Sequence, residues 1–187
     1  MTAAHFYDVR FNSGVHLNPE ETARQIVERV SEFGIPRLML AGAPSVGKSR
    51  TRTHLEAAYP GLCWIEQDAI PRTIGEGLSP CSKTGFDPEQ CFGARLPSTG
   101  PFVCDIGGDN VFYRRADNSA RCLALKDFKS AHRICVVVLE TTQDEHASRY
   151  RESRPRADEV VAAKIWAEWV EVQRPFWLQL HDVWLVT

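Results

Sequence analysis

One segment of the chain has the residue types and the spacing of a phosphate-binding loop. The run Gly42-Ala43-Pro44-Ser45-Val46-Gly47-Lys48-Ser49 matches G-x-x-x-x-G-K-[ST] at every fixed position. Glycines at both ends allow a tight turn in which backbone N–H groups surround a phosphate. Lys48 would then bring a positive charge to the β- and γ-phosphates, and the hydroxyl of Ser49 would bind Mg²⁺. We expect the whole run to contact a nucleoside triphosphate.

The sequence on either side of the loop supports this interpretation. The apolar run 38–41 precedes Gly42 and is expected to be a buried strand, and residues 48–58 are expected to form a helix. A helix N-terminus carries a partial positive charge that favours a bound phosphate. A chance match to the motif in an ordinary turn would not be expected to follow a buried strand and precede a helix.

Kinases, GTPase switches and motors all carry such loops, so other features must separate them. The chain contains no N-K-x-D sequence of the kind that recognises guanine, and 187 residues are few for a motor with sensor domains. Both observations favour a kinase that uses ATP and Mg²⁺.

A carboxylate follows the second expected strand, residues 62–65. Asp68 lies there, 20 residues after Lys48. In a parallel sheet the carboxyl ends of the strands converge on the ligand crevice. Asp68 is therefore expected to orient or deprotonate an acceptor hydroxyl and so to act in catalysis. A helix cap or a solvated turn is the alternative role for this residue.

Arginines are concentrated after the fourth expected strand. They are Arg149, Arg151, Arg154 and Arg156. Phosphoryl transfer places negative charge on the equatorial oxygens, and a lid that carries arginines would stabilise that charge and expel water. We expect a lid around residues 149–157, with Arg154 as a catalytic residue. An exposed basic helix end is the alternative.

A second strand-end carboxylate is a candidate for the metal site. Asp105 follows the run 102–104 and resembles the Walker B aspartate, which holds Mg²⁺ through water. Together with Ser49 it forms the expected metal site. Asp109 competes with it, and a structural hydrogen bond at the strand end is the alternative for both.

Alternation of strands and helices predicts the fold class. Apolar runs at 38–41, 62–65, 102–104, 134–139 and 183–186 are the expected strands. The stretch 158–180 is expected to be helical, with a break or kink at Pro175. This order predicts an α/β fold in three layers, with a parallel five-stranded sheet and helices on both of its faces.

The chain is expected to form one domain of the phosphate-loop kinase type over residues 37–187. Residues 1–36 would supply an arm and a helix packed on that domain, with Asn18 as the helix N-cap and Pro19 at the first helical position. Residues 75–100 are rich in turn-forming residues and too long for a simple connection, so we expect them to line the crevice.

With these residues in view, the chain resembles the shikimate kinase-like branch of small phosphate-loop kinases over roughly residues 37–187. The resemblance rests on Val136–Thr142, Arg149, Arg154-Pro155, Gly107-Gly108, Arg174-Pro175 and Asp182-Val183. It implies that Arg149 lies on the adenine side of the nucleotide. It also implies an acceptor-binding set made of Asp68, Gly107, Gly108, Asp109 and Arg174.

The acceptor part of the pattern departs from that family. Its Asp-x-Asp sequence is Glu66-Gln67-Asp68 here, so only Asp68 carries over, and its triple glycine ends in Asp109. The resemblance therefore implies the fold, the use of ATP and transfer to a hydroxyl, and it does not imply shikimate.

Two other functions remain open on the sequence. The acceptor hydroxyl could belong to a nucleotide or to a hydroxymethylated base in DNA, as in viral DNA modification. Residues 114–156 favour this weakly, because they carry ten Lys and Arg against six acidic residues, but the net charge of −2 does not. A regulatory nucleotide-binding module without an acceptor is the other possibility.

Composition narrows the setting of the protein. No apolar run approaches about 18 residues, so no membrane partner is expected. The six cysteines show no C-x-x-C spacing and are expected to be reduced, which places the protein in the cytoplasm.

Overall fold

The computed structural model describes residues 17–31, 34, 36–67, 73–74, 77–78, 86–106, 111–156 and 158–187. The main strands are β1 (Arg37–Gly42), β2 (Cys63–Glu66), β5 (Phe102–Asp105), β6 (Cys135–Glu140) and β7 (Val183–Val186). The longer helices are α1 (Pro19–Ser31), α2 (Lys48–Ala58), α4 (Asn118–His132), α5 (Gln143–Ser153), α6 (Glu159–Glu168) and α7 (Arg174–Leu180). Short elements are β3 (Thr73–Ile74), β4 (Gly77–Leu78) and α3 (Pro88–Cys91).

The five main strands form one sheet in the order β2-β5-β1-β6-β7, and every neighbouring pair is parallel. The prediction of an α/β fold with a five-stranded parallel sheet is confirmed. The central strands β1, β5 and β6 are almost continuously buried, as expected for strands covered on both faces. Parallel pairing places all five carboxyl ends at the same edge of the sheet.

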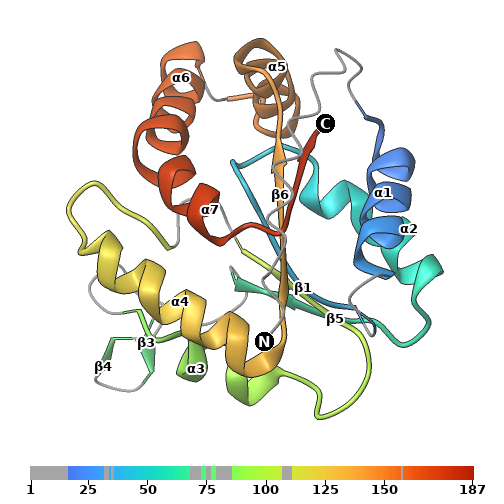
Figure 1. Ribbon diagram of the computed structural model, residues 1–187. Helices are drawn as coiled ribbons and strands as arrows, with labels where there is room; N and C mark the ends of the chain where they lie inside the picture. The colour runs from blue at the N-terminus through green and yellow to red at the C-terminus, as the bar shows by residue number, and fades with distance from the viewer. Residues whose placement is uncertain are drawn as a thin grey trace.

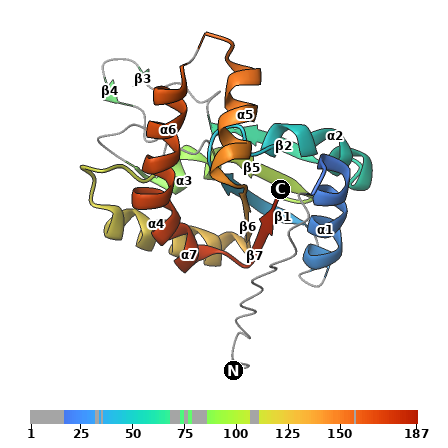
Figure 2. The ribbon, with the colours of Figure 1, turned by 90° about the horizontal axis from the view of Figure 1, so that it is seen from above.

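Helices cover both faces of the sheet (Figures 1 and 2). Helices α1 and α2 lie together on one face, and α4, α6 and α7 lie on the other. Helix α5 follows β6 at the carboxyl edge and packs against α6. The edge where β1 ends is therefore bordered by the start of α2 on one side and by α5 on the other.

Helix α1 shows how local sequence chemistry sets an element. The side chain of Asn18 accepts a hydrogen bond of 2.8 Å from the backbone N–H of Glu21, so the expected cap is present. The helix buries Ala23, Ile26 and Val30, and it packs on α2.

The helical stretch near the end of the chain is divided. Helix α6 continues into a π-helical segment at Trp169–Gln173, and α7 starts one residue before Pro175. Since proline lacks an N–H and fits the first turn of a helix, the expected break occurs as a wider turn followed by a new helix. The sequence reasoning also assigned no helix to residues 118–132, which form α4.

Residues 86–100 pack differently from the expectation that they line the crevice. Cys91 and Phe92 are fully buried, and the ring of Phe92 lies 6.1 Å from that of Phe128 on α4. The guanidinium of Arg37, at the amino end of β1, donates to the carbonyl of Ser98. The described part of this segment therefore supports α4 and the amino edge of the sheet.

Two further findings concern the setting of the protein. No helix within the described ranges is both long and apolar enough to cross a membrane. Cys63, Cys104, Cys122 and Cys135 are free thiols, whereas Cys91 is disulfide-bonded, which corrects the expectation that all six cysteines are reduced.

Candidate functional site

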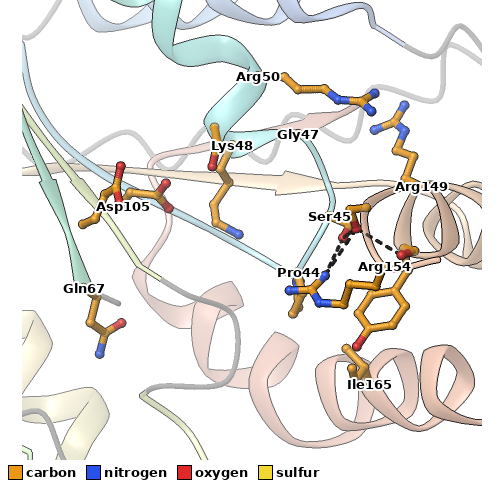
Figure 3. Close-up of a pocket in the computed structure, with 14 residues that line it drawn as sticks. Pro44, Ser45, Gly47, Lys48, Arg50, Gln67, Asp105, Arg149, Arg154 and Ile165 are labelled. Atoms are coloured by element: carbon orange, nitrogen blue, oxygen red, sulfur yellow. Dashed lines mark hydrogen bonds between the residues drawn. The ribbon is translucent and has the colours of Figure 1, made fainter. Parts of the chain in front are cut away.

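A cavity of about 530 Å³ lies at the carboxyl edge of the sheet (Figure 3). Its walls come from the Gly42–Ser49 loop, called the phosphate loop here because its sequence predicts phosphate binding, and from the start of α2. The ends of β2 and β5 and helices α5 and α6 complete the walls. The lining residues are Pro44, Ser45, Gly47, Lys48, Ser49, Arg50, Glu66, Gln67, Asp105, Arg149, Tyr150, Ser153, Arg154 and Ile165. The cavity therefore collects segments that are distant in the sequence.

The loop between β1 and α2 has the backbone that the sequence predicts. Gly42 has φ 149°, and a Cβ atom added there would lie 2.3 Å from the carbonyl oxygen of Leu139. Gly47 is the N-cap of α2 with φ 106°, and no side chain caps this helix end. The first N–H groups of α2 thus begin at the cavity wall, which suits an anion.

Eight loop residues were expected to contact the nucleotide, and they divide into two groups. Pro44, Ser45, Gly47, Lys48 and Ser49 line the cavity. Gly42, Ala43 and Val46 are buried behind them. These three residues therefore support the loop from its buried side and do not line the cavity.

Lys48 extends into the middle of the cavity between Asp105 and Pro44 (Figure 3). Its ammonium group donates to the carbonyl oxygens of Gly42 and Ala43, at 2.9 and 3.1 Å. The residue is only 8% exposed. The loop therefore holds the charged end of Lys48 close to its own backbone, within the cavity.

Two carboxylates lie side by side at the strand ends. Glu66 on β2 and Asp105 on β5 are directly paired in register, and both line the cavity. Asp105 is buried, and the more exposed Glu66 forms a 3.0 Å ion pair with Arg52. The expected metal ligands Ser49 and Asp105 thus share one cavity. Within the described ranges, no group of three or more His, Cys, Asp or Glu residues could hold a metal by itself.

Glu66 and Gln67 are cavity residues that the sequence reasoning did not select. Glu66 was set aside because only Asp68 matched the family pattern. The position of Glu66 at the end of a buried strand, one strand away from Asp105, was the signal that could have identified it. Gln67 follows it and is 3% exposed.

Arg149 is held tightly at the wall formed by α5. Its Nε atom donates to Glu145 at 2.7 Å, and its Nη1 atom donates to the carbonyl of Val46 and to the hydroxyl of Thr187, both at 3.2 Å. The Thr187 hydroxyl in turn donates to the carbonyl of Val46 at 2.8 Å. Arg149 is therefore joined to the phosphate loop and to the residue after β7.

Arg154 lies at the end of α5, where the chain turns toward α6. Its Nη1 atom lies 3.3 Å from the hydroxyl oxygens of Ser45 and Ser153, and its guanidinium lies 4.6 Å from the centre of the Tyr150 ring. Figure 3 shows this side chain reaching back over the phosphate loop. The residue is exposed.

Arg174 is not among the residues that line this cavity. It starts α7 and pairs with Glu140 through Nε at 2.6 Å and Nη2 at 3.3 Å. The indole N–H groups of Trp169 and Trp184 donate to the same carboxylate. Arg174 therefore joins the start of α7 to the end of β6.

Four expected acceptor residues lie outside the described residues. They are Asp68, Gly107, Gly108 and Asp109. The described residues next to them, Gln67 and Ile106, come from the carboxyl ends of neighbouring strands.

The sequence matches no protein-family model, and a search of curated proteins also finds no match. The geometry of the cavity therefore carries the functional argument.

Proposed function

We propose that this protein is an ATP-dependent kinase that transfers the γ-phosphate to a hydroxyl group, in the manner of the shikimate kinase-like enzymes but with a different acceptor. One observation carries the proposal. The cavity combines a phosphate loop, two strand-end carboxylates and two arginines from α5. Each of these groups has a separate role in phosphoryl transfer.

The described residues fit ATP and Mg²⁺. Gly42 admits no side chain, the start of α2 has no side-chain cap, and Lys48 is already inside the loop. A backbone N–H cradle with one fixed cation suits the phosphate chain. Ser49 and Asp105 are oxygen ligands of the type that Mg²⁺ prefers, and the ion commonly completes its shell with water and phosphate. When bound, ATP·Mg²⁺ would supply the phosphoryl group.

The cationic residues have different tasks in this proposal. Lys48 stabilises negative charge on the transferred group, and Arg154 stabilises it from the lid side. Arg149 holds the nucleotide against the phosphate loop. Because Lys48 and Arg149 are held in place before reaction, these two groups need little reorganisation as charge develops.

The carboxylates serve the acceptor and the metal. A carboxylate close to the attacking oxygen takes the hydroxyl proton as the new O–P bond forms, and the leaving group departs with the electron pair of the broken bond. Asp68 remains the expected base. Glu66 and Asp105 are the described carboxylates that could assist, with Asp105 assigned to the metal.

The test is a screen of ATP consumption by the purified protein with shikimate, polyols, nucleosides and DNA that carries hydroxymethyl bases. We expect ATP turnover that depends on one acceptor class, with a phosphorylated product detected by mass spectrometry. Slow hydrolysis with no phosphorylated product in any class would contradict the kinase assignment and favour a regulatory module. Failure to bind ATP·Mg²⁺ at all would remove the nucleotide assignment as well.

A further inference from the structure

Ser45 adopts a backbone conformation that is unfavourable for its residue type. Its φ is 65°, and within the described ranges the only other non-glycine residue with positive φ is Arg133, at 54°. A side chain with a Cβ atom is strained in this left-handed region, and glycine avoids the strain. The same loop uses glycine at its other positive-φ positions, Gly42 and Gly47. A serine at position 45 therefore suggests that its hydroxyl is needed.

The hydroxyl of Ser45 forms a link to the end of α5. Its Oγ atom lies 3.1 Å from the Oγ atom of Ser153 and 3.3 Å from Nη1 of Arg154. Ser153 donates its single proton to the carbonyl of Tyr150 at 3.0 Å. Ser45 must then be the donor to Ser153. Arg154 donates to both hydroxyl oxygens, so the three side chains form a closed ring of hydrogen bonds.

This ring joins two parts of the proposed active site that are 108 residues apart in the sequence. One part is the phosphate loop, and the other is the turn that carries Arg154. Arg154 is exposed, and the bonds within the described residues that tie its guanidinium to the phosphate loop pass through Ser45. Without that hydroxyl, the guanidinium would keep its contact with the Tyr150 ring and lose its link to the loop.

We propose that Ser45 is a positioning residue that, with Ser153, latches Arg154 over the phosphate loop. The inference rests on the proposed kinase function and adds a specific task for a residue that phosphate-loop chemistry does not itself require. Serine is kept despite the backbone strain because its hydroxyl places the arginine for phosphoryl transfer. Replacement by glycine should relieve the strain and release the arginine at the same time.

Ser45→Gly separates this role from a structural one, because activity should fall without a loss of stability. We expect the melting temperature to stay the same or rise by up to about 2 °C, because relief of the backbone strain offsets the lost exposed hydrogen bonds and the entropy that glycine adds to the unfolded chain. We expect kcat to fall about tenfold with little change in KM for ATP, because the arginine is still present but poorly placed. Hydrogen exchange of the amides in residues 150–156 should become faster in the protein without nucleotide.

Arg133→Gly is the matched control, because it removes a side chain from the same kind of backbone at the end of α4. It should affect the melting temperature in the same way and leave kcat and exchange at residues 150–156 unchanged. Ser153→Ala should show part of the kinetic effect. Ser130→Ala, which also removes a hydroxyl bonded to a backbone carbonyl one turn earlier, should show none.

A double-mutant cycle tests whether Ser45 acts through Arg154. In the Arg154→Ala background, Ser45→Gly should change kcat by less than about twofold, since no arginine remains to be placed. A full tenfold loss in that background would overturn the proposal, as would an Ser45→Gly variant with normal kcat and normal exchange.

The exchange measurement keeps this inference distinct from the kinase proposal. If no acceptor is ever phosphorylated but Ser45→Gly speeds exchange at residues 150–156, the latch stands as a feature of the nucleotide site and the kinase assignment fails. If phosphoryl transfer is found and Ser45→Gly leaves both kcat and exchange unchanged, the kinase assignment stands and the latch fails.

Discussion

The two arginines of the arginine-rich segment that line the cavity, Arg149 and Arg154, are held in different ways. In the middle of α5, Arg149 is bound by a carboxylate, a loop carbonyl and the Thr187 hydroxyl, and its side chain is 15% exposed. At the end of the helix, Arg154 is exposed and contacts two hydroxyls and one aromatic ring. The sequence predicts that both arginines belong to one lid, whereas in the structure Arg149 is held more firmly than Arg154.

This difference suggests a division of work. A guanidinium fixed by a partly buried network of several hydrogen bonds keeps one geometry, so it suits a contact that is the same in the ground state and the transition state. A guanidinium held by two long hydrogen bonds to uncharged hydroxyls can be released at small cost, so it suits a contact made only when the site closes. We therefore expect Arg149 to govern nucleotide affinity and Arg154 to govern turnover.

The largest effect should come from Lys48, because in the proposed mechanism both arginines act on a phosphate chain that Lys48 helps to hold. Lys48→Ala should lower kcat by on the order of a thousandfold and leave the fold intact, since a buried charge directed at the transferred group is lost. The fall in kcat is measured as turnover with the acceptor that the screen identifies, and circular dichroism tests whether the fold is intact. Lys164→Ala, an exposed lysine on α6, is the control. More than half of the wild-type kcat in the variant would refute the site.

The next largest effect is expected for Arg154→Ala. We predict that kcat falls about a hundredfold, as for the loss of one transition-state donor, while KM for ATP changes by less than about threefold. The exposed neighbour Arg156, replaced by alanine, should change neither quantity. A rise in KM without a fall in kcat would show that Arg154 binds the nucleotide uniformly, and the contrast with Arg149 would disappear.

Arg149→Ala should give the opposite pattern with a smaller effect. We expect KM for ATP to rise about tenfold and kcat to stay within about twofold, because the contact would be equal in the ground state and the transition state. Arg151→Ala is the control, since Arg151 lies in the same helix but pairs with the exposed residue Glu159. Steady-state kinetics with varied ATP concentration measure both quantities. A loss of kcat as large as that of Arg154→Ala would contradict the proposed difference between Arg149 and Arg154.

Local sequence patterns were sufficient for the elements that build the phosphate loop. Strand β1, the turn at Gly47 and helix α2 are each encoded within about ten residues, and the structure places all three as expected. The five strands of the main sheet were also found, because each contains a short apolar run, and the runs of β1, β5 and β6 are almost continuously buried. Their order across the sheet could not be obtained in this way, since it depends on pairing between distant segments.

The contacts that distinguish the arginines depend on long-range packing. Thr187 reaches Val46 across 141 residues, and Ser45 reaches Ser153 across 108. No spacing rule relates such pairs. For Arg174 the family resemblance implied a contact with the acceptor, whereas the structure shows an ion pair with Glu140. Sequence identified the chemical groups, and tertiary packing decided which of them meet.

The smallest effect concerns His146, which lies on α5 one turn before Arg149. The imidazole is fully buried and packs against Tyr150 and Trp166, at ring distances of 5.8 and 5.1 Å. Burial lowers the pKa of His146, the charges of Arg154 and Lys48 lower it further, and the Pro44 backbone acts in the opposite direction. The folded protein therefore keeps this histidine neutral more strongly than the unfolded chain does.

The sign of the pH dependence follows from proton binding. Near pH 6.5 and below, the unfolded chain binds a proton at this histidine that the folded protein resists, so the free energy of unfolding should fall as the pH drops through that range. One group can change the free energy of unfolding by at most about 1.4 kcal/mol per pH unit.

Denaturant unfolding between pH 5 and 8 measures this dependence. The free energy of unfolding should vary less with pH in His146→Phe, whereas His54→Gln, at an exposed histidine, should keep the wild-type slope. Because the charge of Arg154 contributes to the lowered pKa of His146, Arg154→Ala should also flatten the profile slightly. An unchanged profile in Arg154→Ala would mean that the charge of this arginine has no measurable effect on the imidazole of His146.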